Sequence, residues 1–419
     1  MLIPFRMAFG TAFSFGLIAL VAFLAGPIGH FVHITGYFLT PNPTALGEGQ
    51  GPIYIEDTIH CEDVHYYHAA NLLFTACEDD KSTRLSWFPP LGHMLPLTAQ
   101  GSIHVVDPKT MKSTRLAFEN FQGPFVTHGI DVIEDPEQSN AVYIYAVNHL
   151  SNPAYVEADE PKDLPKAKSQ IELFHYILNS DSIRHVRSIN HPLIQTPNDI
   201  YAISPVSFYV TNDHFYREGP MRLIEDVWRS AKWSSIIHVQ IADLASKDAP
   251  IEASVALTGL WNNNGLGHGR VDNEVIICSA MGGEMFLATR HESNHSISID
   301  TSVSFSSLAD NPSYYHDPYS TDSHDASGFL VAGVSQAIHL MANSKDPNAL
   351  DPIQVWYATL DSRTGVWEKK VLFEDDGSRL RTASAAVLVP IEPKAGKKLA
   401  WLFVTGFMSE SMVAVQVEL

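Results

Sequence analysis

Short apolar runs of strand length recur along most of this chain, from residue 53 to its last residue. Runs such as SIHVVDPKT, AVYIYAVNHL, SFYVTNDH, GFLVAGVS and LAWLFVTGF are rich in Val, Ile, Tyr and Phe, and turn-forming clusters separate them. Strands at this spacing predict a closed all-β architecture. The phrases VVDPKT and ATLDSRTG, each a strand that ends in Asp before a turn, are typical of the outer strands of propeller blades, and the usual range of about 4–8 blades permits six. Helical periodicity is scarce, and residues 219–232 are its best candidate.

The N-terminal residues carry a different pattern. Residues 7–28 hold no charged side chain, and this span of roughly 20 residues matches a helix that crosses a bilayer. The run is longer than the apolar region of a secretory signal and has no clear cleavage site. We therefore expect an uncleaved signal-anchor over residues 1–34, a linker rich in Pro and Gly over residues 35–52, and a propeller domain over residues 53–419. A single preceding arginine places that domain on the lumenal or extracellular side of the membrane; cleavage of the segment would make the protein secreted.

The charge balance narrows the possible partners. The chain carries 47 acidic and 27 basic residues, and its formal net charge is −20. Because phosphate binding needs basic patches, this balance argues against nucleic acid as a partner. An acidic surface favours cations, although the same charge also keeps a protein soluble.

The cysteines and one glycosylation sequon are relevant to whether the domain lies in an oxidising compartment. Cys61, Cys77 and Cys278 allow one disulfide and one free thiol, and the pairing cannot be read from the spacing. The pair to test first is Cys61 with Cys77. Asn294 begins the sequon Asn-His-Ser, which glycosylation could use on the lumenal side.

Pairs of neighbouring oxygen-bearing side chains are the main chemical signal. The stretch TPNDIYAISPVSFYVTNDH holds two Asn-Asp doublets. Because successive side chains of a strand alternate, such a doublet can present one oxygen to each face and serve two cations. The doublets and a solitary asparagine that supply these oxygens are Glu62-Asp63, Asn198-Asp199, Asn212-Asp213, Asp310-Asn311 and Asn264. Their carboxylate and amide oxygens suit calcium. Each doublet alone is also an ordinary turn sequence, so only the set favours a metal site.

Several histidines are candidates for a catalytic role. The string HESNH at residues 291–295 matches the zinc-protease pattern, but that mechanism needs a helix, and the flanking residues are β-prone. His128 and His149 each lie at the end of a strand-like run, where a histidine is usually structural. Near cation ligands, however, an imidazole that titrates close to neutral pH can take a proton from water.

Taken in order, the segments HGIDVIEDPEQSNAVYIYAVNH, NDIYAISPVSFYVTNDHFY, NNNG and SLADN resemble the serum paraoxonase/arylesterase family. The resemblance extends from about Cys61 to the end of the chain. It implies a six-bladed β-propeller with two calcium ions in the central tunnel, which hydrolyses lactones and aryl esters.

The resemblance also assigns residues. It implies that the catalytic calcium is held by Glu62, Asn198, Asn264, Asp310 and Asn311. It implies that a structural calcium is held by Asp63, Asp199 and the carbonyl oxygen of Ile130. The pair that activates water corresponds to His128 and His149, and His214 is retained.

Some features depart from the family pattern. The family joins its N-terminal segment to its last strand by a disulfide, but the end of this chain, VAVQVEL, has no cysteine nearby. Ring closure must therefore rest on strand pairing and burial. A Cys-His pair of the family's tunnel falls near Gly333-Val334, which alters the pocket wall.

Three functions stay open on the sequence alone. The first is a calcium-dependent hydrolase of lactones and aryl esters. The second is a non-catalytic propeller that calcium stiffens and the N-terminal helix holds at the membrane. The third is a sugar-lactone hydrolase with one divalent ion. The natural substrate, activity on phosphotriesters and the oligomeric state also stay open.

Overall fold

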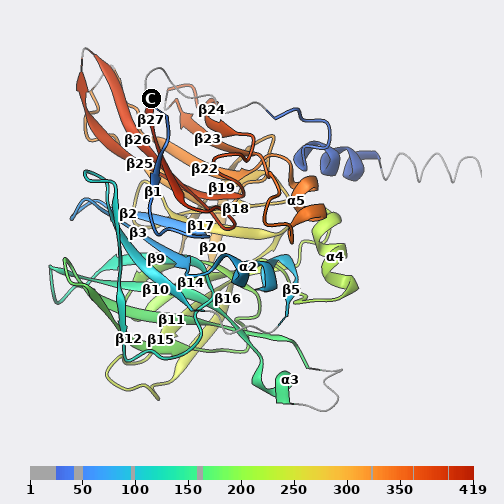
Figure 1. Ribbon diagram of the computed structural model, residues 1–419, viewed down its shortest axis with the longest axis vertical. Helices are drawn as coiled ribbons and strands as arrows, with labels where there is room; N and C mark the ends of the chain where they lie inside the picture. The colour runs from blue at the N-terminus through green and yellow to red at the C-terminus, as the bar shows by residue number, and fades with distance from the viewer. Residues whose placement is uncertain are drawn as a thin grey trace, which may run out of the picture.

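The described residues of the computed structural model are 25–41, 51–95, 100–157, 164–321, 324–361, 363–394 and 396–419. Within them, six sheets of four or five strands follow one another along the chain as the blades of a propeller (Figure 1). The innermost strands of successive blades contact one another all the way round, from β2 to β25 and back to β2. The predicted six-bladed all-β fold is therefore confirmed.

The strands of the first three blades have the following bounds. Blade 1 consists of β2 (Asp63–Tyr67), β3 (Leu72–Glu78), β6 (Gly101–Asp107) and β7 (Lys112–Arg115). Blade 2 consists of β9 (Thr127–Glu134), β10 (Ala141–Ser151), β11 (Ala167–Ile177) and β12 (Ser182–Ile189), with β8 (Ala117–Glu119) added in parallel at its edge. Blade 3 consists of β13 (Pro197–Ser204), β14 (Ser207–Asn212), β15 (Ser234–Ile241) and β16 (Ile251–Leu260).

The other three blades repeat this order from the axis outward. Blade 4 consists of β17 (Asn263–His268), β18 (Glu274–Ser279), β19 (Glu284–Arg290) and β20 (Ile297–Ser304). Blade 5 consists of β21 (Pro312–Tyr315), β22 (Gly328–Val334), β23 (Ile353–Leu360) and β24 (Trp367–Asp375). Blade 6 consists of β25 (Ala383–Lys394), β26 (Lys397–Gly406), β27 (Met412–Glu418) and β1 (Ile53–Ile55).

Strand pairing closes the ring. Strand β1 comes before blade 1 in the chain but pairs antiparallel with β27, so that Ile53 faces Ala414 and Ile55 faces Met412. The disulfide joins Cys61 to Cys77, which is the pair that the sequence analysis singled out for testing, and Cys278 is free and buried. Closure by strand pairing, without a disulfide across the first and last blades, agrees with the prediction.

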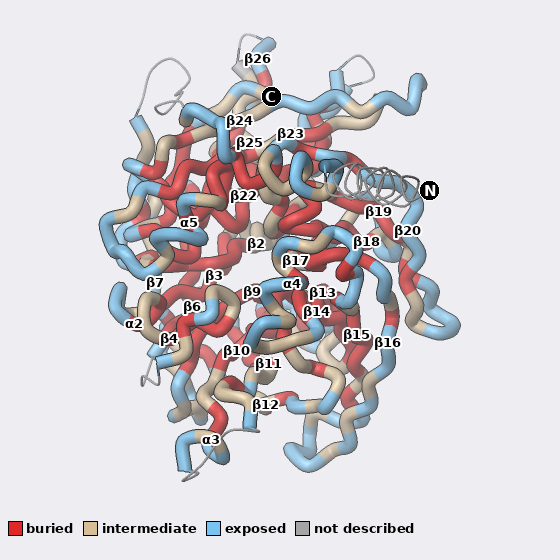
Figure 2. Tube along the Cα trace, turned by 90° about the vertical axis from the view of Figure 1, so that its right-hand side faces the viewer, coloured by how far each residue is buried: buried red, intermediate tan, exposed pale blue. Residues whose placement is uncertain are grey.

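Burial explains the hydrophobic pattern of the strands. Every residue of β14 and β22 is buried, because neighbouring blades cover both faces of these strands. The outer strand β20 is mostly exposed. One apolar cluster fills each space between adjacent blades, all the way round the ring. In Figure 2 most buried segments accordingly lie within the ring, and exposed segments lie on its rim and on insertions such as α4.

Insertions cover one end of the propeller, on the right of Figure 1. They lie between the second and third strands of blades 1, 3 and 5. They comprise α2 (Lys81–Ser86), β4 (Trp87–Phe88), the short helix η1 (Pro89–Leu91), β5 (His93–Met94), α4 (Pro220–Val227) and α5 (Ala337–Asn343). The matching insertion of blade 2 holds α3 (Pro153–Glu157). The helix predicted within residues 219–232 is α4.

The N-terminal segment meets the same end. Residues 25–34 form a helix, and His30 contacts the carbonyl oxygen of Met281 at 3.2 Å. The carbonyl oxygen of Thr35 accepts a hydrogen bond from the N–H of Ile338 in α5. Residues 1–24, which hold most of the predicted anchor, lie outside the described residues. None of the described helices has the length and apolar character needed to span a bilayer, so the membrane anchor stays a prediction.

Two glycines let the inner strands approach closely at the axis. A Cβ atom on Gly129 in β9 would lie 2.4 Å from Oδ1 of Asp199. A Cβ atom on Gly265 in β17 would lie 2.5 Å from the Cα atom of Asn311. Any larger residue at either position would separate neighbouring blades.

Candidate active site

The predicted ligands of the first calcium ion meet beneath the insertions, where the inner strands begin. His128, Asn198 and Asn264 lie in the first residues of β9, β13 and β17. Glu62 and Asp310 come just before β2 and β21. These four predicted ligands and His128 line one cavity of about 560 Å³, whereas the fifth predicted ligand, Asn311, lines a different cavity. Residues distant in sequence therefore converge at one end of the central tunnel.

Several oxygens at this end have no hydrogen-bond partner. Buried polar atoms are almost always paired, so an unpaired group of them calls for a partner. The unpaired buried oxygens of the described residues include Oε2 of Glu62 and the Oδ1 atoms of Asn198, Asn263, Asn264 and Asn311. Asn311 is tied to the group because its Nδ2 donates to Oε1 of Glu62 at 2.9 Å. Carboxylate and amide oxygens of this kind fit a calcium ion.

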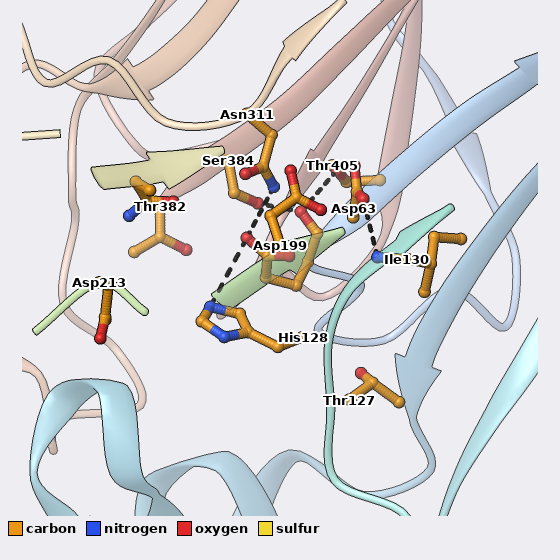
Figure 3. Close-up of polar contacts among 12 residues, drawn as sticks. Asp63, Thr127, His128, Ile130, Asp199, Asp213, Asn311, Thr382, Ser384 and Thr405 are labelled. Atoms are coloured by element: carbon orange, nitrogen blue, oxygen red, sulfur yellow. Dashed lines mark hydrogen bonds and ion pairs between the residues drawn. The ribbon is translucent and has the colours of Figure 1, made fainter. Parts of the chain in front are cut away.

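The carboxylates of the cavity repel one another. Burial, and then the nearby charges of Asp310 and Asp63, raises the pKa of Glu62 well above its usual value. Burial, and then Asp63 and Asp213, does the same to the pKa of Asp310. A bound cation would remove this cost. Figure 3 shows the neighbouring side chains of Asp63, Asp199 and Asn311 grouped above His128.

The donor types argue for a hard ion. Within the part of the chain that the structure describes, no three His, Cys, Asp or Glu side chains gather as metal ligands. The predicted calcium set is of another kind, since three of its five members are asparagines. Residues 291–295, the string that resembles a zinc protease, form a loop rather than a helix.

The two predicted histidines are in contact. Nδ1 of His128 and Nε2 of His149 are 3.0 Å apart and share one hydrogen bond. Nδ1 of His149 lies 2.8 Å from Oγ of Ser169, and the ring of Phe88 meets the His128 ring edge-on at 5.2 Å. If each Nδ1 donates, Nε2 of His128 keeps its lone pair. That nitrogen lies 3.9 Å from Oε1 of Glu62.

The environment keeps both rings neutral. Burial lowers the pKa of His128 to about 3, and the Arg84 guanidinium adds to this effect. Burial and the neighbouring His128 hold the pKa of His149 well below its usual value. A neutral imidazole can accept a proton, so both rings are in the form that a general base requires.

A third histidine, His214, has a different protonation state. Burial alone would lower the pKa of His214, but Asp213 and Asp226 outweigh it and raise the value to about 9. Nδ1 of His214 is 3.1 Å from Asp213, and Nε2 is 2.7 Å from Asp226. His214 is therefore a charged member of the cavity wall. The neighbouring Asn212 is structural, because its Oδ1 accepts the N–H groups of Gln195 and Thr196.

The residues predicted for the second calcium ion lie deeper in the tunnel. Both oxygens of Asp63 and both oxygens of Asp199 accept hydrogen bonds from backbone N–H groups. The N–H of Ile130 donates to Asp63 at 3.0 Å, and the predicted role of its carbonyl oxygen as a ligand stays a prediction. Burial, and then Asp63 and Glu62, raises the pKa of Asp199 well above its usual value. The two predicted metal sets thus differ in how their oxygens are engaged.

Sequence reasoning missed three parts of the cavity and its supports. Phe88 and the other cap residues belong to insertions with no chemical motif. Ser169, on β11, gives no signal in the sequence. Asp213 was noticed as half of a doublet but not as the partner of His214, which follows it directly. That adjacency was the available signal.

Comparisons with known proteins identify the family. The family model described as Arylesterase matches residues 88–389. Serum paraoxonase/arylesterase 2 of Gallus gallus is 26% identical over 189 residues, 45% of this chain and 46% of the relative. Serum paraoxonase/arylesterase 2 of Homo sapiens is 25% identical over 239 residues, 56% of this chain and 59% of the relative. Serum paraoxonase/arylesterase 1 of Homo sapiens is 28% identical over 187 residues, 45% of each chain.

The alignments with these relatives cover only part of each protein. The chain spans about half the length of the curated relatives it matches. Among solved structures, a luciferin-regenerating enzyme is 12% identical and covers 88% of this chain and 95% of its own, with a TM-score of 0.44, a similarity too low to carry an inference. Because the family model covers well over half of the sequence, this chain belongs to the arylesterase family.

Proposed function

We propose that this protein is a calcium-dependent hydrolase of lactones and aryl esters. The observation that carries the proposal is the position of the neutral His128–His149 pair. Nε2 of His128 faces the same cavity as the unpaired oxygens of Glu62, Asn198 and Asn264. A proton acceptor beside a cation-binding set is the combination that water activation needs.

The histidine pair would carry the proton. Water held at Nε2 of His128 would lose a proton to that nitrogen as its oxygen attacks the carbonyl carbon. The proton on Nδ1 of His128 can then pass to Nε2 of His149, 3.0 Å away. Ser169 holds the His149 ring in the orientation that this transfer requires. The adduct then breaks its bond to the alkoxide or phenolate oxygen, and this leaving oxygen takes up the proton from the histidine pair.

A calcium ion held by Glu62, Asn198, Asn264, Asp310 and Asn311 would polarise the carbonyl group and stabilise the negative charge that develops on its oxygen. Glu62, Asn198, Asn264 and Asn311 each keep one oxygen without a hydrogen-bond partner, and burial together with Asp63 and Asp213 raises the pKa of Asp310.

The apolar side chains of the cavity wall would pack against an apolar acyl or aryl group of the substrate. Phe88, Leu223, Leu340 and Phe407 line it, from three insertions and blade 6. A volume of about 560 Å³ lies within the usual range of about 300–1,000 Å³ for small-molecule sites. A compact lactone or phenyl ester suits such a pocket.

One assay tests the proposal. The purified full-length chain should hydrolyse phenyl acetate and simple aliphatic lactones, lose this activity in EDTA, and regain it on addition of calcium. The variant His128→Gln should retain calcium and lose activity about 10²–10⁴-fold, which is the usual contribution of a general base. The exposed His291→Gln is the matched control and should retain full activity.

The same assay separates the alternatives. Calcium binding without turnover of any ester or lactone would support the non-catalytic binding protein. A strong preference for sugar lactones over aryl esters would support the sugar-lactone hydrolase. Unchanged activity in His128→Gln would overturn the assignment of the base.

A further inference from the structure

We propose that this chain holds one calcium ion in its tunnel rather than two, because the aspartates of the second predicted site already serve to join the blades. The first ion belongs to the proposed function, so this proposal rests on it. The difference between the two sites lies in hydrogen bonds, which the described side chains show directly.

Three aspartates follow one pattern along the tunnel. Each accepts a hydrogen bond from the inner strand of the next blade. Asp63 in blade 1 accepts the N–H of Ile130 at 3.0 Å. The other two links are from Ala202 N–H to Asp131 at 2.6 Å, and from Leu266 N–H to Asp199 at 2.7 Å. These bonds join blades 1 to 2, 2 to 3 and 3 to 4.

The second oxygen of each aspartate is also engaged. It accepts the N–H of the residue that follows in the chain, at 2.7 Å in all three cases; these residues are Val64, Val132 and Ile200. Asp131 was never a candidate metal ligand, yet its bonds repeat those of Asp63 and Asp199. The pattern therefore has a structural purpose that needs no ion.

Two histidines supply further donors at this end. Nε2 of His65 is 3.1 Å from Oδ2 of Asp63, and its Nδ1 is 3.3 Å from Oδ1 of Asp131. Nε2 of His268 is 2.8 Å from Oδ2 of Asp131. Both histidines line a cavity of about 290 Å³ at the other mouth of the tunnel. An imidazole nitrogen thus contacts Asp63, one of the two carboxylates predicted to hold the second ion.

A calcium ion needs about 6–8 oxygen ligands. At the second site the N–H of Ile130 is directed at Asp63, and an N–H dipole directed at a site disfavours a cation there. No oxygen of Asp63, Asp131 or Asp199 is among the unpaired buried atoms, whereas four oxygens of the first site are. The residues present fit one ion and do not fit the other.

The primary test counts metal. The full-length protein is equilibrated with calcium, freed of unbound ion by gel filtration, and measured by mass spectrometry for calcium per chain. One equivalent is expected. Two equivalents would overturn the inference while leaving the proposed hydrolase intact. No calcium would overturn the metal dependence of the proposed function, and the inference with it.

A pair of variants tests the role of the histidines. His65→Ala combined with His268→Ala removes donors from Asp63 and Asp131, and the count should rise toward two, with the added ion bound more weakly. The exposed His291→Ala is the control and should stay at one. A count of one in the double variant would overturn the role given to the histidines. If that variant fails to fold, His65→Ala alone is measured, and the wild-type count still decides between one ion and two.

Discussion

Residues that are adjacent in the chain face the two ends of the central tunnel, and their side-chain oxygens differ in whether they have hydrogen-bond partners. Glu62 and Asn198 face the capped cavity, and each has an oxygen with no partner. Asp63 and Asp199 follow them directly in the chain, and all of their oxygens accept backbone N–H groups. The comparison teaches that a doublet of ligand-type residues does not by itself describe two metal sites. What matters is which oxygens the neighbouring blade leaves free.

The largest effect is expected from a substitution among the residues that face the capped cavity. Glu62→Gln keeps the shape of the side chain and removes its charge, so calcium should bind more weakly and ester hydrolysis should fall by about 10²–10³-fold. The measurement is the initial rate as a function of calcium concentration. Glu252→Gln, on the exposed face of β16, removes the same charge and should change neither quantity.

Substitution of the aspartates deeper in the tunnel should lower the stability of the protein but leave its activity at saturating calcium unchanged. Asp63→Ala leaves the buried N–H of Ile130 without its acceptor, which should lower the free energy of unfolding by about 1–3 kcal/mol. Denaturant unfolding measures this loss, and the calcium count should not change. Asp131→Ala removes the equivalent link to Ala202 and serves as the matched control. A loss of one calcium ion in Asp63→Ala would show that Asp63 is a metal ligand after all.

A smaller effect should come from pH at the cavity wall. The pKa of His214 is raised from 6.5 to about 9 in the folded protein. Its stabilising charge is therefore fully present below pH 6.5 and is lost as the pH rises through about 9. The melting temperature should fall by about 1–3 °C between pH 7 and pH 10 beyond the change seen in His214→Gln. If the melting temperatures of the wild-type protein and His214→Gln changed in parallel with pH, this assignment would be wrong.

Cysteine and cap residues show where sequence reasoning stopped. The three cysteines allowed more than one pairing, and the structure selects Cys61–Cys77 because β2 and β3 are adjacent strands of one blade. The cap that shapes the cavity is built from insertions, so Phe88 could not be connected with His128 before the chain was folded. No pattern in the sequence reports a contact between segments whose loops have no repeat.

From the sequence, the apolar period predicted the strands, and the resemblance to a known family supplied the six blades and the residues that meet at the axis. The resemblance was readable because the ligand-type residues lie in motifs at the starts of strands. Only the tertiary structure decided which of those residues have free oxygens, because the donors that occupy Asp63, Asp131 and Asp199 come largely from backbone N–H groups of the next blade. Every residue except proline has such an N–H, so its position depends on how the blades pack and not on the identity of the residue that carries it.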